Sequence, residues 1–168
     1  MEFLYTIFYA CLRLRLLDVE INPGPRRPVH TVCRLLSSNV HGISGNLSDL
    51  TVASSLYDIL LCSETLVSDM HLVSELLVPG FGRPVFLGRG RMPRGRGMAA
   101  YVRDGYGAFP KPKFECGCCE MLVFRVCGAR QNLYVLSFYR NPDLDGRIFD
   151  CLLTSMAAVQ AEDVLASF

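Results

Sequence analysis

Two oxygen-bearing side chains stand where apolar runs of the sequence end. Asn39 ends the run VCRLLSSN (32–39), and Glu64 follows the run YDILLC (57–62). Ligands of α/β sheets gather beyond the carboxyl ends of strands, so the two side chains could share one site. A carboxylate there could bind Mg²⁺, which takes oxygen ligands and usually only one or two carboxylates. From the spacing alone, however, a capping asparagine and a surface glutamate are the simpler interpretation.

A second group of chemically active residues is an arginine-rich segment, Arg83–Arg103. It holds six arginines and no acidic residue, in a chain whose net charge is only +1. Its central members are Arg89, Arg91, Arg94 and Arg96. Phosphate contacts from such a cluster give nucleic-acid affinity that depends on salt and not on sequence. A solvated surface loop without any binding role is an equally good interpretation of the composition.

The elements that must position these residues alternate along the chain. With 168 residues, 51% of them hydrophobic, the chain can form one domain with a substantial core. The patterns predict strands at 32–39, 57–62, 98–102, 120–126 and 132–139, helices near 43–50 and at 68–77 and 145–162, and a loop at 83–97. In the last helix, one apolar stripe is expected to comprise Ile148, Phe149, Leu152, Leu153, Met156 and Val159. Such interleaving indicates an α/β sandwich.

The first 25 residues form a separate leader, distinct from the body at 26–168. Its octamer DVEINPGP (18–25) ends in two prolines around Gly24, which neither a helix nor a central strand can continue through. The octamer resembles the end of ribosome-skipping (2A-like) peptides, in which the chain is released between the residues at Gly24 and Pro25. Leu17 stands where that family usually has glycine.

The apolar start of the leader does not have the pattern of a secretory signal. Glu2 replaces the usual basic residue, and no small-residue cleavage site precedes Pro23. No apolar run reaches the length of about 18–20 residues that a membrane helix needs. We therefore expect no membrane partner, and a nuclear or cytoplasmic location in preference to secretion.

Four motifs of the body resemble a known enzyme family. LLSSNVHGI (35–43), DILLCSET (58–65), RGMAAYVR (96–103) and SFYRNP (137–142) are similar to successive motifs of the endonuclease/exonuclease/phosphatase family. They are most similar to those of the endonuclease domain of non-LTR (LINE-type) retrotransposons. The resemblance implies a partial four-layer α/β sandwich whose second half is missing. It also implies Mg²⁺-dependent phosphodiester hydrolysis, which nicks DNA for target-primed reverse transcription.

The resemblance assigns roles to individual residues. Asn39 would contact the scissile phosphate and help to order the metal site, and Glu64 would be a direct Mg²⁺ ligand. Tyr139 would hydrogen-bond a phosphate oxygen or the attacking water, and Arg140 would neutralise phosphate charge. Without the family, Tyr139 would be interpreted as an ordinary aromatic residue at a strand end.

The last two motifs of the family, Gly-Asp-x-Asn and Ser-Asp-His, do not occur in this sequence. Their absence predicts a fragment that does not cut DNA by itself and that exposes an apolar face. Expected partners are DNA, the missing carboxy-terminal half and the reverse transcriptase of the same element. The alternative is a catalytically dead nucleic-acid-binding remnant that uses the Arg83–Arg103 loop.

Overall fold

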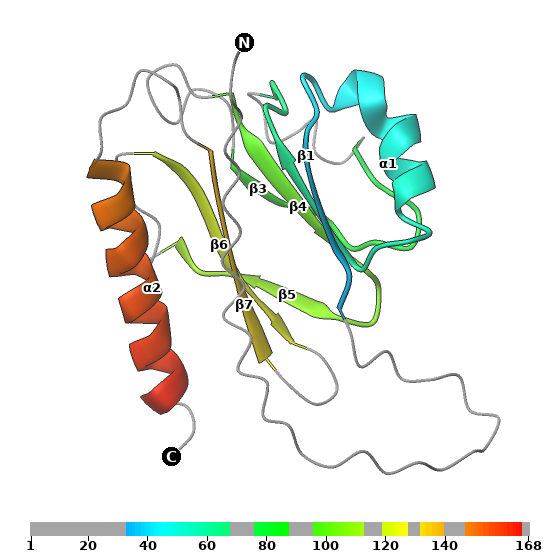
Figure 1. Ribbon diagram of the computed structural model, residues 1–168. Coiled ribbons are helices and arrows are strands. Elements are labelled where there is room, and N and C mark those ends of the chain that lie inside the picture. Colours follow the sequence, from blue (N-terminus) through cyan, green and yellow to red (C-terminus); the bar gives the residue numbers. More distant parts are fainter. Residues whose placement is uncertain are drawn as a thin grey trace, which may run out of the picture.

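The strands of the protein form two separate sheets, seen in the computed structural model of Figure 1. The structure describes residues 33–67, 76–87, 96–112, 119–127, 132–139 and 147–165. The first sheet contains β1 (Leu35–Asn39), β2 (Ile59–Ser63), β3 (Val85–Leu87) and β4 (Met98–Val102), and the second contains β5 (Gly107–Pro110), β6 (Glu120–Cys127) and β7 (Asn132–Tyr139). The described helices are the short η1 (Ser44–Asn46), α1 (Leu47–Ala53) and α2 (Arg147–Leu165).

The order of the strands brings the ends of several motifs together. The first sheet has the order β1-β2-β4-β3, in which β1 and β2 are parallel and the other pairs antiparallel. A parallel pair needs a crossover connection, and this one contains α1. Asn39 and Ser63 are register partners at the carboxyl ends of β1 and β2. The second sheet, β5-β6-β7, is antiparallel throughout.

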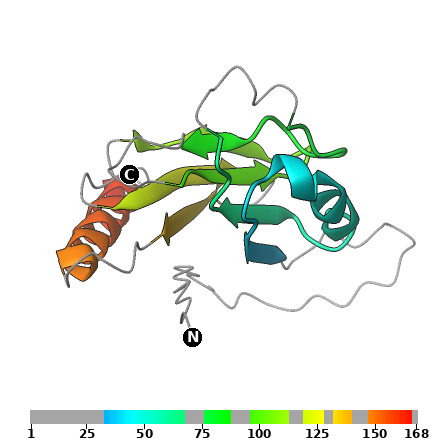
Figure 2. The same ribbon diagram turned by 90° about the horizontal axis from the view of Figure 1, so that it is seen from above.

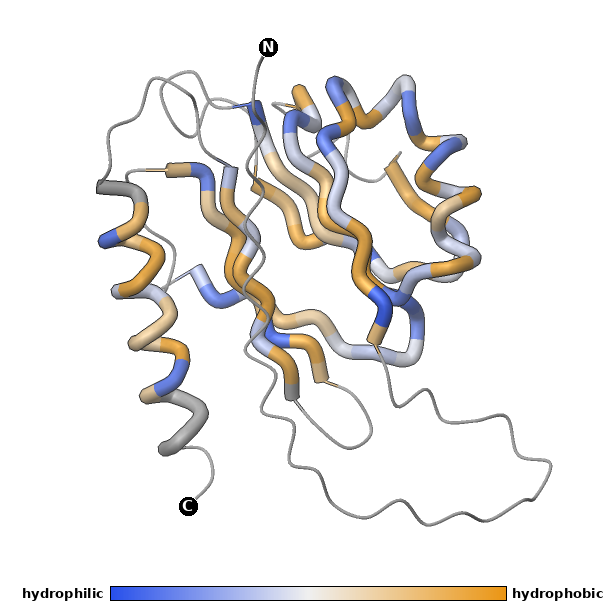
Figure 3. The backbone as a smooth tube through the Cα atoms, in the orientation of Figure 1, coloured by the Kyte–Doolittle hydropathy of each residue, from blue (hydrophilic) through white to orange (hydrophobic). Residues whose placement is uncertain are grey.

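Alternation along each strand divides the apolar side chains among three clusters. In β2, Leu60 and Cys62 face the side of α1, whereas Ile59 and Leu61 face the second sheet. Successive side chains of a strand point to opposite faces, so one strand serves two cores. Figure 2 shows the two sheets packed on each other, and Figure 3 shows hydrophobic stretches along their strands that hydrophilic residues interrupt.

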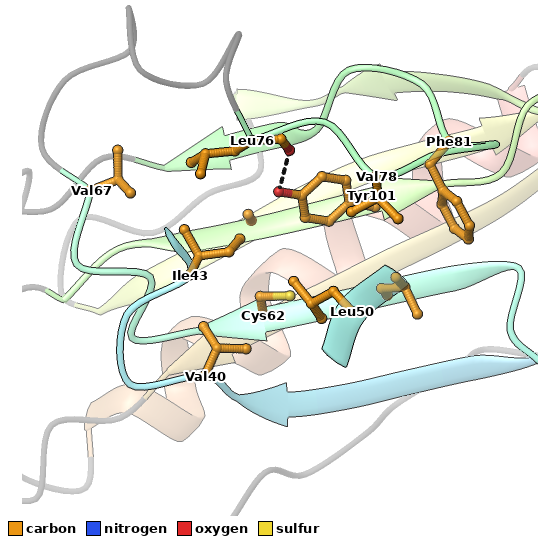
Figure 4. Close-up of a cluster of buried hydrophobic side chains, with 11 residues drawn as sticks. Val40, Ile43, Leu50, Cys62, Val67, Leu76, Val78, Phe81 and Tyr101 are labelled. Carbon is orange, nitrogen blue, oxygen red and sulfur yellow. Dashed lines mark hydrogen bonds between the residues drawn. The ribbon is translucent and has the colours of Figure 1, made fainter. Parts of the chain in front are cut away.

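The outer core of the first sheet is drawn in Figure 4. Ile43 and Leu50 from the β1–β2 connection pack on Tyr101 of β4, and all three side chains are buried. The hydroxyl of Tyr101 donates to the Leu76 carbonyl at 2.8 Å, which satisfies the one polar atom of this ring.

Helix α2 covers the outer face of the second sheet. Its Leu152 and Val159 are buried against Met121 and Val123 of β6. Layers therefore run in the order α1, first sheet, second sheet, α2, which confirms the predicted four-layer α/β sandwich. Among the described residues, each sheet packs on the other sheet on one side and on helical or loop residues on the other. The predicted exposure of a large apolar face stays a prediction.

The apolar stripe predicted for α2 is wrong at two positions. Phe149 and Leu153 are 43% and 62% exposed, and Ser155 is buried instead. The buried line follows Leu152, Ser155 and Val159, at spacings of three and four residues, as a helix face requires. The side chain of Ile148 lies outside the described set.

The predicted strands, and the helices predicted near 43–50 and at 145–162, agree with the observed elements to within a few residues, with two omissions. β3 lies inside the predicted loop 83–97, and β5 was not predicted. The leader 1–25 and residues 68–75 of the predicted helix 68–77 lie outside the described residues. Residues 76–77 of the predicted helix 68–77 are not helical. None of the described helices is long and apolar enough to cross a membrane.

Candidate active site

Three chain segments are joined by backbone hydrogen bonds at one end of the sandwich. Gly42 donates its N–H to the carbonyl of Glu64 at 2.8 Å, and Leu66 donates its N–H to the carbonyl of Arg96 at 2.8 Å. The turn after β1, the loop after β2 and the residues before β4 are thus fixed to one another. The Asn46 side chain adds to this by donating to the carbonyl of Gly42 at 3.0 Å.

The same segments carry unusual backbone conformations. His41, Glu64 and Leu66 have φ values of 43°, 54° and 58°, and no other non-glycine residue of the described ranges has a positive φ. Such conformations cost about 1–3 kcal/mol each and persist where the surroundings enforce them, often at functional sites. Their concentration in two adjacent loops marks this end of the molecule as a candidate site.

The carboxylate of Glu64 is the centre of a polar cluster. The Tyr139 hydroxyl donates to its Oε1 at 2.5 Å, and the Arg96 guanidinium donates to its Oε2 at 3.1 Å. The Nδ1 atom of His41 lies 2.8 Å from the same Oε2. The Glu64 side chain itself is only 5% exposed. Because Tyr139 belongs to the second sheet and Glu64 follows a strand of the first, the site bridges the sandwich.

The neighbours of Glu64 keep it ionised in spite of its burial. Burial raises the pKa of this carboxyl, but the hydrogen bond from Tyr139, the amide of Asn39 and the positive charge of Arg96 outweigh it, and the net pKa is lowered. Burial and the hydrogen bond to Glu64 raise the pKa of Tyr139 to about 12. At neutral pH the site therefore contains a carboxylate and a protonated phenol.

Two buried polar atoms of the site have no hydrogen-bond partner. They are Nδ2 of Asn39 and Oγ1 of Thr65, two of only three such side-chain atoms among the described residues. The Asn39 Oδ1 accepts the backbone N–H of His41 at 3.2 Å, so its Nδ2 is the atom left unpaired. The Asn39 amide lowers the pKa of Glu64 as a nearby hydrogen-bond donor, although its Nδ2 lies outside strict hydrogen-bond geometry. An unpaired buried donor suits an anionic ligand such as a phosphate oxygen.

A second buried carboxylate supports the site from the neighbouring sheet. Glu120 is 3% exposed, and its two oxygens accept the backbone N–H groups of Arg96 and Gly97, each at 2.9 Å. Glu120 is also the register partner of Tyr139. It thus fixes the position from which the Arg96 side chain starts.

The structure brings together Asn39, Glu64, Tyr139 and Arg96 of the residues selected from the sequence. Arg89, Arg91, Arg94 and Arg140 lie outside the described residues.

Sequence reasoning missed His41 and Glu120. His41 lies in the turn after β1, where a positive φ aims its ring at Glu64. Glu120 gave one signal in the sequence, because it is a charged residue at the start of a mostly apolar strand.

The side chains of the site could hold a magnesium ion only with few protein ligands. No group of three His, Cys, Asp or Glu side chains that could hold a metal exists among the described residues. Glu64 offers a buried, ionised carboxylate whose Oε1 accepts a hydrogen bond from Tyr139. Mg²⁺ keeps several waters and is often held by one carboxylate and substrate phosphates, so one carboxylate is compatible with it.

Comparison with known proteins finds similarity among solved structures. No family model matches the sequence, and no curated protein matches it. The chain is similar to AP endonuclease LMAP from Leishmania major, with a TM-score of 0.47 and 15% identity, over 68% of this chain. The similar region covers 42% of that protein, so this chain spans less than half of its length. The activity in that name belongs to the Leishmania protein.

Proposed function

We propose that this chain carries part of a LINE-type retrotransposon endonuclease, a member of the endonuclease/exonuclease/phosphatase family that hydrolyses phosphodiester bonds of DNA with Mg²⁺. One observation carries the proposal. The side chains of Asn39, Glu64 and Tyr139, from three motifs far apart in the sequence, meet in one buried polar cluster. The four motifs quoted above supply the family, and this geometry supplies the chemistry.

Each residue of the cluster has a definite task in this proposal. The unpaired Nδ2 of Asn39 donates to an oxygen of the scissile phosphate. Tyr139 stays protonated at neutral pH. Once Glu64 holds the cation, Tyr139 would turn its single proton from Glu64 to a phosphate oxygen or to the attacking water. Glu64 stays ionised and would hold the cation. A bound Mg²⁺ would supply polarisation of the phosphoryl oxygen and stabilisation of the leaving oxygen.

A second candidate function is nucleic-acid binding without cleavage. β3 ends at Leu87 and β4 begins at Met98, and these two residues are register partners. The arginine-rich residues between them therefore join the sheet at the end where Glu64 lies, because Met98 is also paired with Ser63. A chain that binds phosphates there and lacks the rest of the catalytic machinery would bind DNA and leave it intact.

Two assays on the full chain distinguish the candidates. Supercoiled plasmid is incubated with Mg²⁺ or with EDTA, and DNA binding is measured by filter retention at increasing salt. Mg²⁺-dependent nicking that is lost in Glu64→Gln supports an endonuclease. Salt-sensitive binding without nicking supports the second candidate.

The matched control removes a carboxylate of α1 away from the site. Asp49 is exposed on that helix, so Asp49→Asn makes the same chemical change as Glu64→Gln without touching the cluster. It should leave both assays unchanged. Neither nicking nor DNA binding by the wild-type chain would contradict both candidates.

A further inference from the structure

The ion pair between Arg96 and Glu64 is unequal in its exposure. The guanidinium side chain is 53% exposed, whereas the carboxylate side chain is 5% exposed. The Glu64 carboxylate is therefore fixed in the protein. The Arg96 guanidinium can move into solvent without uncovering apolar surface. An ion pair of this kind can be exchanged without unfolding its surroundings.

The main chain of Arg96 cannot take part in such an exchange. Its N–H is bonded to Glu120 at 2.9 Å and its carbonyl accepts the N–H of Leu66 at 2.8 Å. Any movement is thus limited to the side chain, because the backbone of Arg96 is fixed. This limit favours two discrete positions of the guanidinium over a general loosening of the loop.

Arg96 and a divalent cation compete for the same carboxylate. Oε2 of Glu64 already has Arg96 at 3.1 Å and His41 at 2.8 Å, so a cation at Glu64 would meet a permanent positive charge. A guanidinium that leaves the carboxylate needs another anion, and a phosphate matches its planar fork. The unpaired Asn39 Nδ2 beside Glu64 offers a phosphate a place to bind within the same site.

We propose that Arg96 is an exchangeable partner of Glu64 that transfers to a nucleic-acid phosphate when DNA binds and so opens the carboxylate to a divalent cation. Arg96 acts as a positioning residue that couples the two ligands, and this inference rests on the proposed function. By linkage, DNA raises the affinity for the cation as much as the cation raises the affinity for DNA.

The test measures Mn²⁺ binding to the full chain by electron paramagnetic resonance of the free ion, with and without a saturating DNA duplex. Wild-type protein should bind Mn²⁺ about 5- to 150-fold more tightly with DNA present, the usual range of such coupling. Arg96→Gln should bind Mn²⁺ more tightly than wild type without DNA, and the gain on adding DNA should shrink. Arg96→Lys keeps the charge and should retain part of the coupling.

The matched control is Arg34→Gln, an exposed arginine just before β1, at the opposite end of that strand from Asn39. It should keep the wild-type coupling. Equal Mn²⁺ affinity with and without DNA in the wild type would overturn the inference and leave the proposed function standing. Absence of Mn²⁺ binding under every condition would overturn both.

Discussion

Glu64 illustrates how neighbours decide the state of a buried acid. Burial alone would leave this carboxyl protonated more easily than in water, yet its net pKa is lowered by the phenol, the amide and the guanidinium around it. Removing any of these neighbours should therefore move the carboxyl toward its neutral form.

The depressed pKa of Glu64 predicts a specific dependence of stability on pH. A carboxyl whose pKa is lower in the folded state contributes stability above its unfolded pKa, near 4.3, and loses it as the pH falls through the folded value. The difference in unfolding free energy between wild type and Glu64→Gln should thus be constant from pH 7 to about 5 and shrink below that. Urea denaturation at a series of pH values measures it, and a difference that does not change down to pH 3 would contradict the account.

The hydroxyl of Tyr139 should stabilise the fold through its bond to the Glu64 carboxylate. Tyr139→Phe removes that hydroxyl and leaves a buried charge with one donor fewer, a loss of about 1.5–3 kcal/mol for a bond to a charged group. It should also raise the pKa of Glu64, observable by carbon NMR of the carboxyl. Tyr57→Phe, in the outer core and away from the site, is the control and should leave that pKa unchanged.

At the residue level, the sequence predicts the site residues that stand at strand ends. It predicts few of the site residues that other turns and strands supply. Asn39 and Glu64 can be found because each follows an apolar run. The part played by His41 depends on a left-handed turn, and that of Glu120 depends on the packing of two sheets. The left-handed turn has no local signature in the sequence, and the charge at the start of β6 does not reveal what Glu120 contacts.

At the level of elements, the composition of the sequence does not reveal the short strands. β3 has three residues within a segment rich in Gly, Pro and Arg, and it exists because it pairs with β4. β5 pairs with β6 in the same way. A segment this short has too few alternating positions for a period to be recognised, so tertiary pairing decides its structure.

Helix α2 offers the sharpest prediction at this scale, because two adjacent leucines differ in burial. Leu152 is 6% exposed and Leu153 is 62% exposed. Leu152→Ala should lower the unfolding free energy by about 2–5 kcal/mol, as expected for a buried leucine. Leu153→Ala should change it by no more than about 0.5 kcal/mol. Chemical denaturation of both variants measures the pair, and equal losses would mean that another face of α2 covers the sheet.

At the level of the whole molecule, the site depends on how the two sheets pack. Glu64 follows β2 of one sheet and Tyr139 ends β7 of the other, so the core between the sheets sets their separation. That core includes Ala100 and Phe124, both fully buried. The alternation of elements predicts an α/β sandwich, and only the family resemblance adds the four layers. The contact across the sheets could not be predicted from either.

Enlarging a side chain between the sheets should therefore affect the distant carboxyl. Ala100→Leu adds volume to this core and should cost about 1–3 kcal/mol through overpacking. By forcing the sheets apart it should also weaken the bond from Tyr139 and raise the pKa of Glu64. Val52→Leu, at a position of α1 that is 72% exposed, is the control and should change neither quantity.

The most direct test of the central claim is to locate a divalent cation on the protein. Mn²⁺ is added to isotopically labelled full chain with a DNA duplex, and the paramagnetic broadening of backbone amide signals is mapped. The account predicts broadening centred on residues 39–42, 64–66 and 96–97, and its loss in Glu64→Gln. Broadening centred elsewhere, or unchanged by that substitution, would contradict it.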